Sequence, residues 1–170
     1  LNNVIKSGHN RLSYSQVWTA LMYTDQDPNN ANNVILLYTA RSVHKDFRAG
    51  QTNDQDAWNR EHVWAKSHGF PSSGQWGYTD IHHLRPADVS VNSKRGNKDF
   101  DNGSSQISEA TGNYTDGDSF EPMDSVKGDV ARMIMYMDVR YEGGDSSGTP
   151  DLEISNNLTS TGQALLGKKC

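Results

Sequence analysis

Three polar residues of this chain, Glu61, His62 and Asn92, are of the types that hydrolyse a phosphodiester with the help of one divalent metal. That reaction needs hard oxygen ligands for the metal and a separate base that takes a proton from the attacking water. A carboxylate and a carboxamide supply such oxygen ligands, and a neutral imidazole is a suitable base near neutral pH. The three residues therefore form a candidate site for metal-assisted hydrolysis.

Glu61 and His62 are a weak signal on their own, because neighbours on a strand point to opposite faces of a sheet. An ion-paired glutamate beside a surface histidine is the ordinary explanation of such a pair. The thirty positions from His62 to Asn92 change this assessment. They are enough for a loop, a second strand and the start of a helix that fold back over the first strand. Such an arrangement would bring the three side chains into one pocket.

Two other functions stay open on the residues alone. Six histidines allow a zinc-dependent hydrolase that uses His62, His82 or His83 with a carboxylate, although the spacing His-Glu-x-x-His is absent. A nucleic-acid-binding module without catalysis is the second alternative. Thiol and P-loop chemistry fit poorly, because the single cysteine is the terminal Cys170 and no Gly-x-Ser-x-Gly or Walker motif occurs.

Composition describes one loop-rich globular domain. The chain has 170 residues, of which 34% are hydrophobic and 22% are charged, and no apolar run approaches the roughly 20 residues that span a bilayer. The formal net charge is -5, but the stretch 85–98 carries a local net charge of +3. Its charged residues are Arg85, Lys94, Arg95 and Lys98, against Asp88. A solvated surface is the commoner role of such a stretch, and phosphate binding is the functional alternative.

The first elements that must position the candidate site are a helix and a strand. Hydrophobic spacing predicts an amphipathic helix over 14–23, with Ser13 as its N-cap. A polar turn is expected over 29–33. The β-rich run over 34–39 predicts a central buried strand.

The candidate residues themselves fall on a predicted strand, loop, strand and helix. Alternation over 58–64 predicts a strand that ends near His62, and the Gly, Ser and Pro residues of 66–79 predict a loop. A second short strand is expected over 81–84. The chain then turns at Pro86 into a short helix that carries Asn92.

The second half of the chain contains the strongest helix signal. Residues 101–121 are poor in apolar side chains and predict an excursion on the surface. A core helix is predicted over about 124–142, ended by Gly143-Gly144. Its apolar stripe consists of Val126, Val130, Met133, Ile134, Met137 and Tyr141. A short helix is expected near 160–166.

Four segments in order resemble the endonuclease I family, the bacterial periplasmic and extracellular nonspecific nucleases of the ββα-metal, or His-Me finger, class. The resemblance covers roughly residues 13 to 142, and Ala65 stands where the family usually has Pro. The segments are Asn59-Arg60-Glu61-His62-Val63-Trp64, Asp80-Ile81-His82-His83-Leu84-Arg85-Pro86-Ala87-Asp88, Val91-Asn92-Ser93-Lys94-Arg95-Gly96-Asn97 and Lys127-Gly128-Asp129-Val130-Ala131-Arg132. This resemblance implies a single α+β domain over 1–170, with a small mixed or antiparallel sheet flanked by helices and a ββα-metal core over about 56–100.

The resemblance also implies a role for each candidate residue. Glu61 and Asn92 would hold a divalent cation, typically Mg²⁺ with Mn²⁺ or Ca²⁺ possible in its place, and His62 would be the general base. His83 would lie beside the site as a supporting residue. Arg95 and Asn97 match the family's helix pattern: Asn97 is expected as a supporting residue, and Arg95 either touches phosphate or braces the fold. Arg95, Lys94 and Arg85 are the candidate contacts to substrate phosphate.

A water nucleophile leaves the 2′-hydroxyl without a part in cleavage, so DNA and RNA are both expected substrates, with 5′-phosphate products. We expect the second ring nitrogen of His62 to donate to a backbone carbonyl, and activity to fall at low pH. By the resemblance we expect a secreted or periplasmic monomer without a membrane partner. The chain begins at Leu1 with no basic segment before an apolar one, so any export signal is expected to have been removed or never present.

Overall fold

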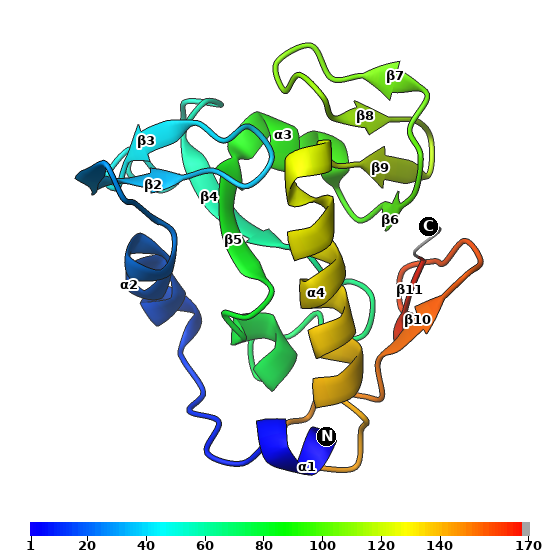
Figure 1. Ribbon diagram of the computed structural model, residues 1–170. Coiled ribbons are helices and arrows are strands. Elements are labelled where there is room, and N and C mark those ends of the chain that lie inside the picture. Colours follow the sequence, from blue (N-terminus) through cyan, green and yellow to red (C-terminus); the bar gives the residue numbers. More distant parts are fainter. Residues whose placement is uncertain (168–170) are drawn as a thin grey trace.

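The computed structural model describes residues 1–167 and has mixed α and β structure (Figure 1). The helices are α1 (Asn2–Ile5), α2 (Tyr14–Thr24), the 3₁₀ helix η1 (Trp76–Thr79), α3 (Val89–Arg95) and α4 (Asp124–Arg140). The strands are β1 (Gln26–Asp27), β2 (Asn30–Ile35), β3 (Ser42–His44), β4 (Trp58–His62), β5 (Leu84–Asp88), β6 (Asp99–Phe100), β7 (Ser105–Gln106), β8 (Tyr114–Thr115), β9 (Ser119–Glu121), β10 (Glu153–Ser155) and β11 (Leu165–Gly167). Among residues 1–167 they form small sheets with the orders β1-β2-β3, β4-β5, β6-β9-β8-β7 and β10-β11. The predicted α+β class is confirmed, with the strands divided among several sheets.

The expected β-β-α arrangement consists of β4, β5 and α3. β4 and β5 are antiparallel, and their register pairs Glu61 with Arg85 and His62 with Leu84. α3 begins at Val89, directly after β5, so its first turns lie beside the strand pair. This connection places Asn92 on the element next to Glu61 and His62.

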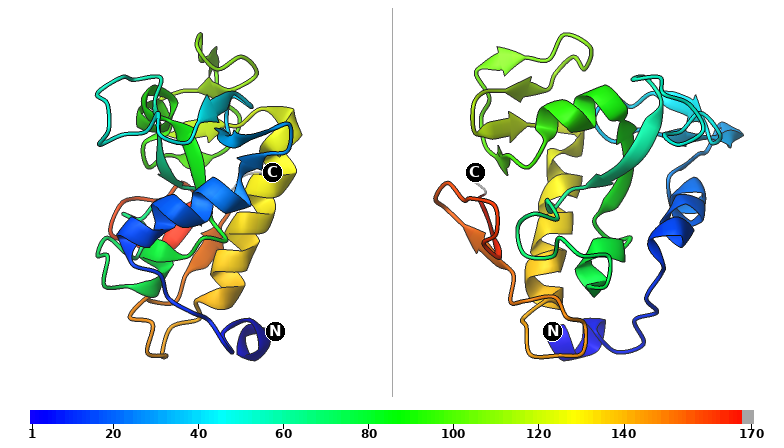
Figure 2. Two further views of the ribbon diagram at one scale, coloured as in Figure 1. Left: turned by 90° about the vertical axis from the view of Figure 1, so that its left-hand side faces the viewer. Right: turned by 180° about the vertical axis from the view of Figure 1, so that it is seen from behind.

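The β4–β5 pair lies between two hydrophobic clusters. Trp58 and Leu84 belong to a cluster that includes residues of α2, β2 and β3, whereas Ala87 and the following Val91 belong to one that includes residues of α4. Figures 1 and 2 show α2 and α4 on opposite sides of the pair. Each large apolar side chain buried in this way contributes about 1.5–3 kcal/mol, so packing on both sides holds the pair in place.

The second strand begins later than predicted. β5 spans Leu84–Asp88, and residues 81–83 form a turn, so the predictions of a strand over 81–84 and of a turn at Pro86 are wrong. In a strand the N and O atoms of a residue point to the same side. The Pro86 carbonyl accepts from the Leu37 N–H at 2.9 Å, away from β4. The missing N–H of proline therefore removes no hydrogen bond between β4 and β5.

The apolar run over 34–39 is also mostly not a strand. β2 spans Asn30–Ile35, so the predicted turn over 29–33 is strand and the predicted strand ends early. Leu36 and Leu37 are buried in the turn that follows, and they enter different hydrophobic clusters. The apolar character of this run reflects burial on two sides rather than strand pairing.

Both long predicted helices are confirmed. α2 begins with the capping box of Ser13, whose Oγ accepts from the Gln16 N–H at 3.3 Å while its own N–H donates to Gln16 Oε1 at 2.7 Å. α4 buries the predicted stripe, and Gly143 follows it with a φ of 65° that suits glycine. The buried members of that stripe are Val130, Met133, Ile134, Met137 and the C-cap Tyr141.

Two predictions for the polar segments need correction. Residues 101–121 contain β7, β8 and β9 and bury Ile107 and Phe120, so they form a small sheet on the core rather than only a surface excursion. The helix expected near 160–166 is wrong, because β11 pairs there in parallel with β10. Cys170 and the last residues of the predicted domain 1–170 lie outside the described part. None of the helices within residues 1–167 is long and apolar enough to cross a membrane.

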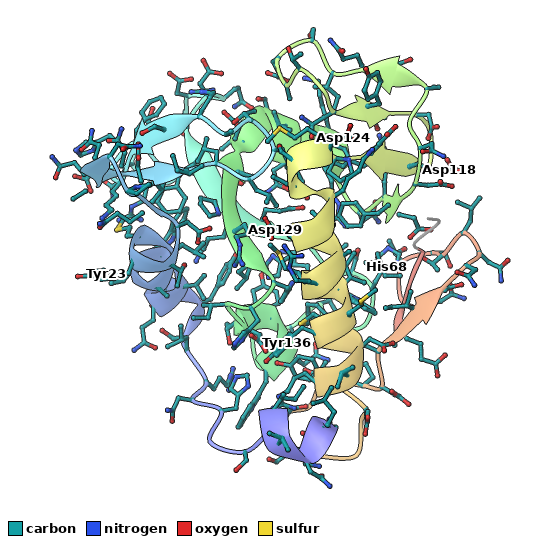
Figure 3. All side chains as sticks on the ribbon, viewed as in Figure 1. Tyr23, His68, Asp118, Asp124, Asp129 and Tyr136 are labelled. Carbon is teal, nitrogen blue, oxygen red and sulfur yellow. The ribbon has the colours of Figure 1, made fainter. Side chains whose placement is uncertain are left out.

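A buried carboxylate ties α4 to the turn before β5. Asp80 Oδ2 accepts hydrogen bonds from Tyr136 Oη at 3.0 Å and Tyr141 Oη at 2.8 Å. Tyr136 lies on α4 and is labelled in Figure 3. Its Oδ1 accepts from the backbone N–H of His82 at 3.0 Å and pairs with the ring Nδ1 at 2.8 Å. Burial acts to raise the Asp80 pKa, but these hydrogen bonds and the neighbouring histidines lower it overall. This carboxylate holds the segment that leads into the candidate site.

Candidate active site

A pocket of about 460 Å³ follows β4 and collects the residues that the sequence singles out. The four consecutive side chains of residues 59–62 all line it. Because consecutive side chains leave a strand on opposite faces, the pocket must run along the edge of β4 rather than over one face. Its principal polar and aromatic lining residues are Tyr14, Trp18, Asn59, Arg60, Glu61, His62, Lys66, Asn92, Arg95 and Asn97.

Glu61 is a buried carboxylate at the wall of this pocket. Its side chain is 2% exposed, and Oε1 accepts from Tyr38 Oη at 2.8 Å and lies 3.4 Å from Arg95 Nη1. Burial raises the pKa of Glu61, while the positive charge of Arg95 and the Tyr38 hydrogen bond act to lower it. Burial outweighs these two contacts, so the pKa of Glu61 lies above its ordinary value, and the guanidinium and the hydroxyl are the groups that favour the ionised carboxylate.

His62 has the ring orientation that the sequence predicts. Its Nε2 lies 2.9 Å from the Tyr78 carbonyl oxygen. A carbonyl only accepts, so Nε2 carries the proton and Nδ1 is the nitrogen with a free lone pair. Burial and the neighbouring His83 lower the pKa of His62 well below its ordinary value. The imidazole is therefore neutral at physiological pH and able to accept a proton.

Asn92 presents its carboxamide from the middle of α3. Its Nδ2 donates to Asn59 Oδ1 at 2.7 Å. Because the amide nitrogen is already hydrogen-bonded to Asn59, the oxygen atom Oδ1 of Asn92 is the atom left to bind a ligand. Asn59 on β4 therefore sets the orientation of Asn92.

Arg95 is enclosed behind the site. Its side chain is 1% exposed, and its guanidinium donates to the carbonyls of His62 at 2.9 Å and Val63 at 2.7 Å. It pairs with Glu61 as described. These contacts give Arg95 a bracing role at the end of β4.

The other basic residues proposed for phosphate lie away from the pocket lining. Arg85 donates to the carbonyls of Ile81 and Leu84 and lies 3.5 Å from Asp25. Lys94 pairs with Glu109. The structure does not bring either of them to Glu61, His62 and Asn92, whereas the exposed Asn97 does line the pocket.

His83 is packed beneath His62 and is fully buried. The two ring centroids are 5.6 Å apart, His83 Nε2 donates to the Gly77 carbonyl at 2.7 Å, and Nδ1 has no hydrogen-bond partner within residues 1–167. Burial lowers the pKa of His83 to about 4. This ring does not reach the pocket lining, so its geometry is that of a supporting residue.

The lowered pKa of His83 predicts acid destabilisation. In the unfolded chain His83 is protonated below the ordinary histidine pKa of about 6.5. In the folded protein it is protonated only below about pH 4. The free energy of unfolding should therefore fall between these values, by on the order of 3 kcal/mol from this group. Urea titrations at pH 7.0, 5.5 and 4.5 measure this fall, and His83→Gln should show a shallower one. Stability that stays level across this range would contradict the prediction.

The geometry gives the zinc alternative no support. In the described part of the chain, no three His, Cys, Asp or Glu side chains come together in a way that could hold a metal ion. The rings of His62 and His83 are turned to different backbone carbonyls, and His82 is turned to Asp80. A single glutamate with a carboxamide oxygen is instead the kind of donor set that suits a hard cation.

Residues 1–153 match the family model described as Endonuclease I. The chain belongs to the endonuclease I family. The stretch matched includes β4, β5, α3 and the whole pocket lining. The resemblance drawn from the four sequence segments is confirmed.

Two curated relatives are similar over most of this chain. An extracellular ribonuclease of Bacillus amyloliquefaciens is 64% identical over 165 residues, which cover 96% of this chain and 55% of that protein. An extracellular ribonuclease of Bacillus subtilis (strain 168) is 62% identical over 160 residues, which cover 94% of this chain and 54% of that protein. The chain thus spans about half the length of the curated relatives that it matches.

Sequence reasoning does not assign a role to three residues that build the site. Asn59 belongs to the first motif, and its position close to Glu61 and His62 is the only indication of a role in the site. Tyr38 lies in an apolar run that suggests plain core. Tyr78 contributes its backbone carbonyl to His62, a role that no side-chain type can indicate.

Proposed function

We propose that this chain is a metal-dependent, sequence-nonspecific endonuclease that hydrolyses RNA and DNA to products with 5′-phosphate ends. The observation that carries the proposal is the state of His62 in the pocket. Its Nε2 is committed to the Tyr78 carbonyl, and it lines the same pocket as Glu61 and Asn92. A base and two oxygen ligands in one pocket are the minimum for metal-assisted hydrolysis.

The residues present fit a magnesium ion. Glu61 offers a carboxylate and Asn92 offers a carboxamide oxygen, because Asn59 already engages the Asn92 nitrogen. Mg²⁺ prefers oxygen ligands and usually keeps several waters, so two protein ligands suffice. When bound, the ion would stabilise negative charge that develops on the phosphate and on the departing 3′-oxygen.

His62 would remove a proton from the attacking water through Nδ1. The hydrogen bond from Nε2 to the Tyr78 carbonyl holds the ring in the required tautomer and orientation. Because burial lowers the His62 pKa, the neutral form persists to a pH below the ordinary histidine value. Activity should then fall only when the imidazole becomes protonated in more acidic solution.

The substrate and the location are proposed from the relatives and the chemistry. Both relatives bear the name extracellular ribonuclease, which supports RNA as a substrate and secretion as the location. Since water is the nucleophile, the 2′-hydroxyl is not required and DNA is an equally acceptable substrate. We propose that the chain acts as a monomer.

Digestion assays test this function. The protein is incubated with RNA and with supercoiled plasmid in the presence of Mg²⁺, with excess chelator, and after metal is added back. We expect cleavage of both substrates, its loss with chelator, and its return with Mg²⁺ or Mn²⁺ but not with Zn²⁺. End-labelling should detect 5′-phosphates. Cleavage that continues in excess chelator would contradict the proposed metal dependence. Binding of nucleic acid without cleavage under every condition would favour the non-catalytic binding module.

A further inference from the structure

Arg60 lies on β4, two positions before His62, and carries a positive charge. The two residues are two positions apart on β4, so their side chains leave the strand on the same face, and both line the pocket. The guanidinium carbon of Arg60 lies 3.4 Å from the centroid of the Tyr14 ring and 4.1 Å from that of Trp18. Its Nη1 also donates to the Tyr14 carbonyl. The two rings of α2 and this hydrogen bond hold Arg60 in one position.

The charge of Arg60 is not compensated by the protein. Within residues 1–167 it has no carboxylate at ion-pair distance, and its buried Nε has no hydrogen-bond partner. Among the described residues, five other arginines have such a carboxylate: Arg41 with Asp88, Arg85 with Asp25, Arg95 with Glu61, Arg132 with Asp129 and Arg140 with Asp145. A partly buried cation without an anion is unfavourable, so the pocket is prepared for an anionic ligand.

We propose that Arg60 binds a phosphate of the nucleic-acid strand next to the phosphodiester that is cleaved. A planar guanidinium matches the geometry of a phosphate group and donates charge-assisted hydrogen bonds to its oxygens. This inference rests on the proposed function and names the residue that positions the substrate. The exposed Lys66, whose Nζ donates to Tyr78 Oη at 3.1 Å, lines the same pocket and offers a second, less confined charge.

The same arrangement accounts for a lack of base recognition. Tyr14 and Trp18 are the aromatic residues of α2 at the pocket, and the guanidinium of Arg60 lies over both rings. The ring face that the guanidinium covers is not available for stacking with a base. Contacts to phosphate position a strand without reading its sequence, and they are equally possible with RNA and DNA.

The test measures KM and kcat at several salt concentrations, with a labelled RNA oligonucleotide and with DNA of the same sequence. Arg60→Gln should raise KM about tenfold or more at low salt while kcat changes much less. The slope of log KM against log salt should become shallower by about 0.7, the loss of one phosphate contact to a single strand. Arg60→Lys keeps the charge, so it should retain most of the slope and yet bind more weakly.

Arg48→Gln is the matched control. The Arg48 guanidinium also packs over Trp18, at 4.9 Å from the ring centroid, but Arg48 is not among the pocket-lining residues. Its replacement should leave KM and the salt slope unchanged, which separates phosphate binding from packing on Trp18. Melting curves show whether each variant is folded.

Three outcomes decide the proposal. A shallower slope for Arg60→Gln alone supports phosphate binding by Arg60. An unchanged slope with a lower kcat, or equal changes in Arg48→Gln, would overturn it and leave Arg60 a structural residue. If the unmodified protein itself cleaves neither substrate, the proposed function fails, and the inference fails with it.

Discussion

Replacing His62 with alanine should lower the rate of nucleic-acid cleavage by about two to four orders of magnitude. We propose the imidazole as the base of the pocket, because its Nε2 donates to the Tyr78 carbonyl and Nδ1 is left to accept a proton. Alanine keeps Glu61 and Asn92 in place and removes only the base. The measurement is the initial rate of plasmid relaxation and of RNA cleavage with saturating Mg²⁺.

His44→Ala is the control for this experiment. His44 is an exposed histidine of β3 that does not line the pocket, so its loss should leave both rates unchanged. His62→Ala should still bind RNA, because it retains Arg60 and both oxygen ligands. Cleavage by His62→Ala at the rate of the unmodified protein would remove His62 from the mechanism.

Glu61→Gln should abolish cleavage and also destabilise the fold. The carboxylate is 2% exposed and is the ion-pair partner of Arg95, which is itself 1% exposed. Neutralising Glu61 leaves the Arg95 charge buried without an anion, which typically costs about 3–5 kcal/mol when one partner of a buried pair is removed. The expected result is a lower melting temperature together with loss of Mg²⁺-dependent cleavage.

Asn92→Ala separates the two roles that are combined in Glu61. Asn92 is only partly buried, and its side chain donates to Asn59 Oδ1 rather than to a residue of the core. We therefore expect cleavage to be lost while the melting temperature stays within a few degrees of the unmodified protein. A sharp drop in the melting temperature of Asn92→Ala would instead show that Asn92 stabilises α3.

A Glu61→Gln variant with the melting temperature of the unmodified protein would contradict the stabilising role of the buried ion pair.

Elements whose signal is local could be predicted from the sequence. The α2 capping box needs only Ser13 and Gln16, which are three positions apart, and the apolar stripe of α4 repeats at helical spacing. β4 ends at His62 as its alternation predicts. Elements whose position depends on a distant partner could not be predicted. Pro86 sits inside β5 because its carbonyl meets Leu37, which lies almost fifty residues earlier in the chain.

The types and order of the candidate catalytic residues are a property of the sequence. Glu61, His62 and Asn92 stand within motifs of the endonuclease I family, and reading those motifs is enough to expect one pocket. The sequence also leads to the expectation that a backbone carbonyl orients His62. The tertiary structure decided which carbonyl this is, because Tyr78 reaches the ring only through the loop between β4 and β5.

The sequence alone determined that Glu61, His62, Asn92 and a basic stretch stand in family order. Only the tertiary structure decided which cations face the pocket. Lys94 and Arg95 look equivalent along the chain, yet one pairs with Glu109 outside the pocket and the other is enclosed beside Glu61. The role proposed for Arg60 cannot be inferred from its place in the sequence. It depends on two facts of packing: α2 supplies aromatic rings beneath the guanidinium, and within residues 1–167 no carboxylate lies at ion-pair distance from it. The free energy of a charge depends on its three-dimensional neighbours, which the order of residues does not display.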